Sequence, residues 1–186
     1  MDLDTLIHNF KGHLNTINNH KRMVMEYCFR VGLYKQGLLH DLSKYSPQEF
    51  IPGVIYYQGD RSPNNAQREA LGYSDAWLHH KGHNKHHYEY WIDYPTNKDA
   101  GLVGMKMPVK YVVEMFCDRV GACKTYKGKA YTSSDPYDYF MRGNAKNVMH
   151  PETAALLEKL LVMLRDDGEK KVFRYIRKEL MKKRDY

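Results

Sequence analysis

Histidine and aspartate residues carry the clearest chemical signal in this chain of 186 residues. Ten histidines are present, and five of them fall between His79 and His87. Elsewhere, His40 and Asp41 are adjacent and follow the apolar stretch Gly37-Leu38-Leu39. Imidazole nitrogens and carboxylate oxygens are both good ligands for divalent first-row metal ions. Because neighbouring residues on a helix point about 100° apart, both can reach one ion only at a helix end or across a cleft.

Two distant residues make the His-Asp pair more informative. His20 falls on an apolar helical stripe, with Val24 one turn later, and Asp118 falls on a segment with two apolar helical faces. A carboxylate without a partner in such a place is costly, and a metal ion or an arginine would offset that cost. Taken singly, His20 is explained by a hydrogen-bonded core histidine and Asp118 by a buried ion pair with Arg or Lys. Together with His40 and Asp41, they form one candidate ligand set.

The order of these four residues resembles the HD superfamily, whose pattern is a helical His, a His-Asp pair and a distant Asp on a later helix. The strings HKRMVMEYCFRVGLYKQGLLHDLSK and VVEMFCDRVGACKTY look like the first and last signature segments of that superfamily. The resemblance spans roughly residues 13–126. The strings YYQGDRSPN and WLHHKGHNKHHYEYW further resemble the DUF5662 proteins.

This resemblance implies a helical bundle that holds one or two divalent ions in a cleft, with Mn, Mg, Fe, Ni, Co and Zn all candidates. It also implies a phosphohydrolase acting on a small phosphorylated molecule, such as a nucleotide or cyclic nucleotide. The expected chemistry is metal-activated water, with the ion neutralising charge on phosphate oxygens. Lys44, one turn after His40-Asp41, could donate to the phosphate, although a plain surface lysine explains it equally well.

The dense histidine cluster is the second candidate site. If it is helical throughout, His79, His83 and His86 share one side, and His80, Asn84 and His87 share another. Extra histidines bind a second metal in some HD branches, which implies His80 and His87 first, with His79, His83 and His86 behind them. Contact with the phosphate, or general acid catalysis, is the alternative role. A histidine-rich surface turn is the structural alternative.

Two further residues are candidates for binding substrate. Arg61 stands in the segment GDRSPN, and a guanidinium suits bidentate phosphate recognition, although a structural turn explains the segment equally well. Asn84, within the histidine cluster, is the second candidate.

The elements that must position these residues are predicted to be helices in a single domain over residues 1–186. The expected segments are one helix, or two in line, up to Gly32; a short helix over 37–45; a helix from Pro47 with Ser46 and Glu49 as a capping box; a helical piece over 64–71; helices over 108–126 and from Asp135; and a hairpin over about 150–184 turning at Gly168. Residues 93–107 are expected to form a loop. No strand is predicted, so the fold class is all-α.

Composition and charge disfavour several other classes of function and site. The net charge is +7, of which five units come from residues 168–186, a pattern typical of a solvated helix face. No nucleic-acid recognition motif is present, so a nucleic-acid-binding module is only an alternative. The three cysteines are few, odd in number and set in apolar helical patterns, which argues against a disulfide framework. None of them belongs to a C-x-x-C pair, which argues against a thiolate zinc site. Without a long apolar run or a secretory leader, a cytoplasmic protein without a membrane partner is expected. A di-iron oxygenase and an inactive metal-stabilised scaffold remain further alternatives.

Overall fold

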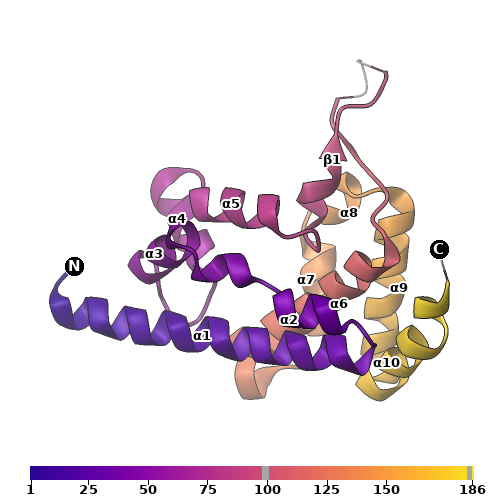
Figure 1. The fold of residues 1–186 in the computed structure, drawn as a ribbon, viewed down its shortest axis with the longest axis horizontal. Helices are drawn as coiled ribbons and strands as arrows, with labels where there is room; N and C mark the ends of the chain where they lie inside the picture. Colours follow the sequence, from indigo (N-terminus) through magenta and orange to yellow (C-terminus); the bar gives the residue numbers. More distant parts are fainter. Residues whose placement is uncertain (98–100, 184–185) are drawn as a thin grey trace.

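The structure, a computed structural model, describes residues 1–97, 101–183 and 186. The described part is helical, as the sequence predicts, and the helices pack as one unit (Figure 1). The α-helices are α1 (Leu3–Arg30), α2 (Tyr34–Leu39), α3 (Pro47–Ile55), α4 (Pro63–Leu71), α5 (Asp75–His83), α6 (Val109–Lys127), α7 (Asp135–Arg142), α8 (Ala145–Val148), α9 (Pro151–Asp167) and α10 (Glu169–Lys178). Short 3-10 helices are η1 (Leu42–Tyr45), η2 (Tyr88–Trp91), η4 (Gly128–Ala130) and η5 (Leu180–Lys182).

Helix α1 is the longest element and is unbroken. Asp2 caps its N-terminus, because the Asp2 carboxylate accepts a 2.8 Å hydrogen bond from the Thr5 backbone N–H. The asparagines that could have marked a break do not interrupt it, and Asn19 donates to Asn15 at 3.2 Å along one face. The opposite face is buried and includes Ile17, His20 and Val24. The first predicted segment is therefore one helix.

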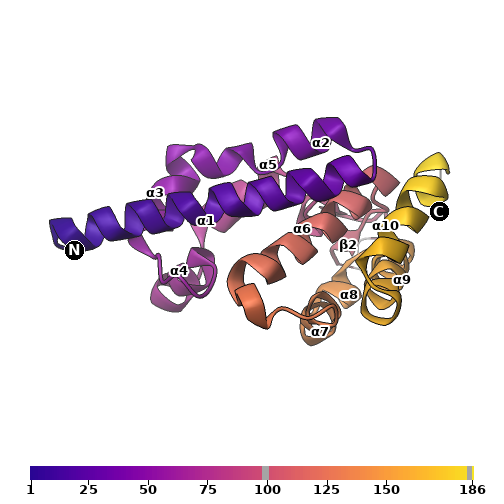
Figure 2. The same cartoon turned by 90° about the horizontal axis from the view of Figure 1, so that it is seen from below.

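Helix α6 lies at the centre of the core. Val112, Val113, Phe116, Cys117 and Val120 are fully buried, as expected for a helix that is apolar on both sides. Helices α1 and α9 pack against it, and Figure 2 shows α6 running alongside α1.

The hairpin of α9 and α10 turns at Gly168, which adopts a positive φ of 81°. Its buried residues complete the same core: Leu157, Leu160, Leu161, Leu164, Val172 and Ile176. The prediction of a C-terminal hairpin is confirmed, with α10 ending at Lys178; position 184, its predicted end, lies outside the described residues.

Helix α3 packs on the N-terminal half of α1, whereas α2 packs on the C-terminal half. Helix α3 packs against α1, and both α4 and α5 pack against α3. The approach of α3 is close, because a Cβ on Gly53 would lie 2.2 Å from Nε2 of His13. The absence of a side chain at Gly53 therefore allows α3 to pack directly against α1.

Three local predictions are corrected. The expected helix over 37–45 is broken into α2 and η1 at His40 and Asp41. Ser46 stands at the N-cap of α3 but makes no side-chain capping bond, and Glu49 turns inward to two histidines instead of reaching back to Ser46. Within the loop predicted over 93–107, β1 (Ile92–Asp93) pairs antiparallel with β2 (Val103–Gly104). Strands of two residues are too short to show the alternation that predicts a strand. Residues 98–100 of this loop lie outside the described residues.

Across the described ranges, no helix combines the length and the apolar character needed to cross a membrane.

Candidate metal centre

The His40-Asp41 pair sits at a sharp corner of the backbone. Helix α2 ends at Leu39, and Asp41 adopts the left-handed conformation with φ 54° and ψ 26° before η1 begins. Lys21 of α1 donates 2.8 Å hydrogen bonds to the carbonyl oxygens of Leu38 and His40. These bonds satisfy carbonyls that the end of α2 leaves without helical partners. Because the helix ends at this corner, the adjacent side chains of His40 and Asp41 can both reach one ion.

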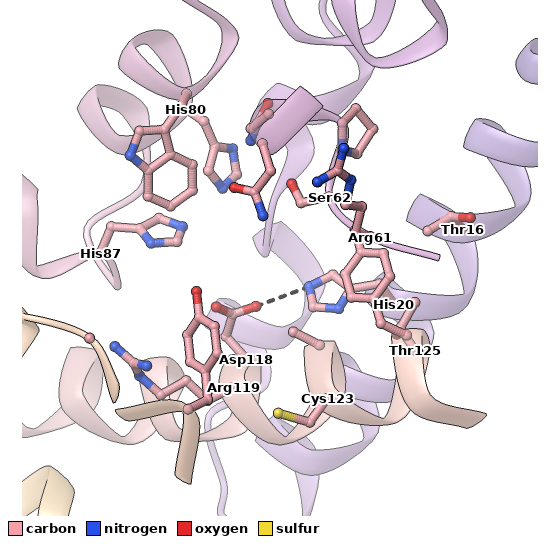
Figure 3. A pocket seen from close by; sticks show the side chains of 18 of the residues that line it. Thr16, His20, Arg61, Ser62, His80, His87, Asp118, Arg119, Cys123 and Thr125 are labelled. Carbon is pink, nitrogen blue, oxygen red and sulfur yellow. Dashed lines mark ion pairs between the residues drawn. The ribbon is translucent and has the colours of Figure 1, made fainter. Parts of the chain in front are cut away.

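The four residues of the first predicted ligand set are brought together. His20, His40, Asp41 and Asp118 each offer a ligand atom, and these atoms lie within 4.8 Å of one another. Nε2 of His20 is 3.0 Å from Oδ1 of Asp118, the pair joined by the dashed line in Figure 3. Nε2 of His20 and Nε2 of His40 are 3.4 Å and 3.3 Å from Oδ2 of Asp41. Segments nearly one hundred positions apart in the chain therefore meet at one point.

A second set adjoins the first through Asp41. His80, His86 and His87 offer nitrogens within 4.8 Å of one another and of an Asp41 oxygen. Nε2 of His80 and Nε2 of His86 are both 3.4 Å from Oδ1 of Asp41. Each oxygen of Asp41 thus faces a different set, Oδ2 the first and Oδ1 the second.

The ligand atoms at this junction lack ordinary partners. Five buried side-chain atoms there have no hydrogen bond in the structure, namely Nε2 of His20, His40, His86 and His87 and Oδ1 of Asp41. A buried polar atom without a partner costs free energy, so such atoms normally mark an ion or a water. Imidazole and carboxylate groups converging in this way can hold a divalent metal ion. The residues present therefore fit the metal that the sequence predicted.

Two glutamates orient the histidines, and neither of them was predicted to be a site residue. Oε1 of Glu114 accepts from Nδ1 of His40 at 3.1 Å and lies 3.3 Å from Nδ1 of His86. The carboxylate oxygens of Glu49 lie 2.7 Å from Nδ1 of His80 and Nδ1 of His79. When Nδ1 of a ligand histidine is held by a carboxylate, Nε2 is left for the metal and the ring is fixed. One sequence signal was present for Glu114, which stands one helical turn before Asp118 among apolar residues.

Electrostatics keep the carboxylates ionised. Burial opposes ionisation of Asp41, but the charges of His40 and Lys44 outweigh it, so the pKa of Asp41 lies well below its usual range. Burial likewise opposes ionisation of Asp118, but the neighbouring imidazoles of His20 and His40 outweigh it and hold the pKa of Asp118 well below its usual range. Burial lowers the pKa of His80 and of His87. Ionised carboxylates and neutral imidazoles are the protonation states in which these groups bind a metal. His40 differs, because Asp41, Asp118 and Glu114 outweigh its burial and hold its pKa well above the usual range, so a bound metal would displace its proton.

The histidine cluster follows a different register from the predicted one. Helix α5 ends at His83, and Asn84 is extended with φ −120° and ψ 104°, so the residues beyond it leave the helical pattern. His86 is consequently buried beside His80 and His87 in the second set. His79 reaches Glu49 rather than the ligand cluster, and His83 is exposed and stacks on His79. The structure thus brings three of the five histidines to the centre.

The three predicted substrate-binding residues already make contacts with other groups of the protein. Nζ of Lys44 lies 2.5 Å from Oδ2 of Asp41. Arg61 makes two 2.7 Å hydrogen bonds to the exposed carboxylate of Glu69. The side-chain amide of Asn84 donates to Oγ of Ser43 at 2.7 Å and to the backbone oxygen of His80 at 2.8 Å. Lys44 and Asn84 therefore support ligand residues, whereas Arg61 pairs on the surface.

A cavity of about 750 Å³ opens beside this centre. Its wall includes His20, His80, His87 and Asp118, and Figure 3 shows His80 and His87 facing Asp118 across it. Trp77, Tyr126, Tyr139 and Phe140 line other parts of the wall. This volume matches that of sites for small organic molecules, which commonly measure about 300–1,000 Å³.

Comparison with known proteins gives one match. Residues 9–163 match a family described as "Family of unknown function (DUF5662)". Neither a curated protein nor a solved structure matches the chain. The matched range contains both ligand sets, Glu49 and Glu114. Because the match covers most of the sequence, the chain belongs to the DUF5662 family.

Proposed function

We propose that this protein is a metal-dependent phosphohydrolase of the HD type, acting on a small phosphorylated molecule through two metal ions that share Asp41. The observation that carries the proposal is the pair of buried ligand sets, each facing one oxygen of Asp41, with five ligand atoms that lack hydrogen bonds. Sites of two divalent ions bridged by such a group are suited to displacement at phosphorus. The order of His20, His40, Asp41 and Asp118 along the chain agrees with the HD pattern.

The donor atoms favour transition metals. The first set offers two imidazoles and two carboxylates, and the second offers up to three imidazoles and one carboxylate. Mg²⁺ and Ca²⁺ prefer oxygen ligands alone, whereas sites that combine imidazoles with carboxylates suit Mn²⁺, Fe²⁺, Co²⁺, Ni²⁺ and Zn²⁺. The proposal therefore expects one of these latter ions.

Bound metal would supply a water activated near neutral pH and charge neutralisation at the phosphate. The protein's own residues do the rest. Glu114 and Glu49 hold the histidine rings in place, and Lys44 anchors Asp41. The aromatic part of the cavity wall offers a surface for the organic part of a substrate. These roles require no large rearrangement, because the contacts are already made.

The test begins with the metal content of the purified protein by mass spectrometry, followed by turnover on phosphomonoesters and cyclic nucleotides. We expect two transition-metal ions per chain and turnover that a chelator abolishes. The double variant His80→Ala, His87→Ala should retain one ion and lose most turnover. His83→Ala is the matched control, because His83 lies on α5 but is exposed.

Other results would favour other functions. Two irons with oxygen consumption would favour the di-iron oxygenase. Metal that raises the melting temperature but supports no turnover on any phosphoester would favour the scaffold. Full metal content and full turnover in the double variant would contradict the two-metal proposal.

A further inference from the structure

The basic residues that line the cavity divide into paired and unpaired groups. Five basic side chains line it, namely Lys44, Arg61, Arg119, Lys127 and Arg142. Carboxylates neutralise three of these, because Lys44 pairs with Asp41, Arg61 with Glu69 and Lys127 with Asp135. Arg142 is exposed, and its Nε donates only to a backbone oxygen of its own helix. Arg119 is left as the partly buried guanidinium without a carboxylate.

Arg119 lacks an ion pair with any residue in the described part of the chain, and its buried Nε has no hydrogen-bond partner. Its Cζ instead lies 5.8 Å from the ring centre of Tyr139 and 5.5 Å from that of Phe140. Aromatic faces hold a guanidinium in place without cancelling its charge. The Arg119 side chain is therefore positioned but not neutralised.

The location of Arg119 relates that free charge to the metal centre. Arg119 follows Asp118 directly on α6, and both residues line the cavity. Figure 3 shows Arg119 on the side of the cavity where His87 lies, whereas Arg61 is drawn on the side of His20. An anion bound between the candidate metal centre and Arg119 would face a guanidinium that no carboxylate pairs with in the described part of the chain. The planar fork of arginine suits two parallel hydrogen bonds to a phosphoryl group.

We propose that Arg119 binds the phosphoryl group of the substrate, and that the cavity accepts molecules carrying a single phosphoryl group. This inference rests on the function proposed above. The charge count supports the restriction to one phosphoryl group. A triphosphate chain would bring further negative charges into a cavity whose other basic side chains are paired or exposed, and whose wall also carries Glu89 and Asp60. A single phosphoryl group can be satisfied by Arg119 and the metal centre alone.

The primary test is calorimetric titration of inorganic phosphate into the metal-loaded protein. Arg119→Gln should weaken phosphate binding by about 10–100-fold, which corresponds to losing one charge-assisted contact. Arg119→Lys should give an intermediate loss, since it keeps the charge but not the fork. Arg61→Gln is the matched control and should bind phosphate as the wild type does. Metal content measured on each variant reports whether the ligand sets remain intact.

A competing structural role for Arg119 is partnership with Glu89, whose buried Oε2 also lacks a hydrogen bond. Glu89→Gln separates the two roles. If Arg119 only balances Glu89, this variant should reproduce the effect of Arg119→Gln. Under our proposal it should bind phosphate at least as tightly as the wild type, because a negative charge leaves the cavity wall.

A kinetic comparison tests the size of the phosphate group. We expect kcat/KM for nucleoside monophosphates to exceed that for the matching triphosphates by at least about tenfold. We also expect kcat/KM for monophosphates to fall in Arg119→Gln. Wild-type phosphate affinity in a fully metallated Arg119→Gln variant, or no phosphate binding by the metal-loaded wild type, would overturn the inference. Equal turnover of triphosphates would overturn its restriction to one phosphoryl group.

The two proposals fail separately. Phosphate binding that depends on Arg119, without hydrolysis of any phosphoester, would support the role of Arg119 and contradict the proposed hydrolase. Hydrolysis that does not change when Arg119 is replaced would support the hydrolase and contradict the role of Arg119.

Discussion

Two buried glutamates orient different histidines of the candidate ligand sets. Glu114 contacts one histidine from each ligand set, His40 and His86, whereas Glu49 contacts only His80 among the ligands. We therefore expect Glu114→Gln to lower the affinity of both metal sites, by about 10–100-fold. Glu49→Gln should lower the affinity of the second site alone. Metal titration of the two variants measures this difference.

The exposed Glu69→Gln serves as the control for these substitutions and should titrate like the wild type. Equal losses at both sites in Glu49→Gln would show that the glutamates do not act separately.

His13 gives the protein a titratable group away from the ligands. Burial, with the positive charge of Lys44 adding to it, lowers the pKa of His13 from 6.5 to about 4. Between these values the unfolded chain takes up a proton that the folded protein does not. The stability contributed by His13 is therefore fully present above pH 6.5 and is lost as the pH falls towards 4. We expect His13→Leu to lose less stability than the wild type between pH 7 and pH 5.

The measurement is urea denaturation of chelator-treated protein at the two pH values. His8→Leu replaces an exposed histidine on the same helix and should behave like the wild type. The same acid sensitivity in His13→Leu and wild type would refute this assignment.

Residue types and order were enough to predict that the four residues of the first candidate ligand set lie together, but not which residues support them. His20, His40, Asp41 and Asp118 follow a known order, so their meeting could be expected. Glu49 was assigned to a helix cap, because the capping pattern and an inward-facing glutamate look the same in sequence. Glu114 was not selected, because nothing in the sequence states which histidine its carboxylate reaches.

Among the elements, the crossing of α1 and α6 controls whether the first ligand set can form. A Cβ on Gly121 would lie 2.7 Å from a methyl carbon of Val24, one turn after His20. Gly121→Ala should therefore push the helices apart, at a cost of about 1–3 kcal/mol. A gain in helix propensity of about 1 kcal/mol opposes this cost. We expect weaker metal binding together with lower or unchanged stability.

A double-mutant cycle identifies the cause of that change. Adding Val24→Ala to Gly121→Ala should remove the clash, giving a favourable coupling energy of about 1 kcal/mol in urea denaturation. Gly82→Ala is the control, because a Cβ there meets nothing within 4 Å. Additive effects of the Gly121 and Val24 substitutions would contradict a clash at the crossing.

The sequence predicted most helices because their apolar periodicity is long. Helix α6 and the pair α9 and α10 follow such patterns over many residues. The end of α5 could not be predicted in this way, since the histidine, asparagine and lysine residues at 83–86 carry no periodic apolar signal. The helical register assumed for the cluster placed His86 with His79 and His83, and the actual end of α5 at His83 brings His86 to the candidate metal centre instead.

In the molecule as a whole, the candidate ligands tie distant parts of the chain together. They come from α1, the corner after α2, α5 with the loop that follows it, and α6. A single metal ion that binds only the folded protein, at one hundred times its Kd, adds about 2.7 kcal/mol to the free energy of unfolding. For a chain of this length, that should raise the melting temperature by about 5–11 °C.

Thermal unfolding with metal and with excess chelator measures this shift. Asp41→Asn should show little or no shift, because both sites lose their shared carboxylate. A wild-type protein that melts at one temperature under both conditions would contradict the presence of these sites.

The left-handed backbone of Asp41 also limits how this site can change during evolution. Residues with a Cβ pay about 1–2 kcal/mol for that conformation, and aspartate, asparagine and glycine tolerate it best. Asparagine and glycine are each one nucleotide change away from aspartate in the genetic code. Descendants that lose the proposed activity but keep the fold are therefore expected to carry Asn or Gly at this position first. A bulky or β-branched residue at this corner would instead compromise the fold together with the site.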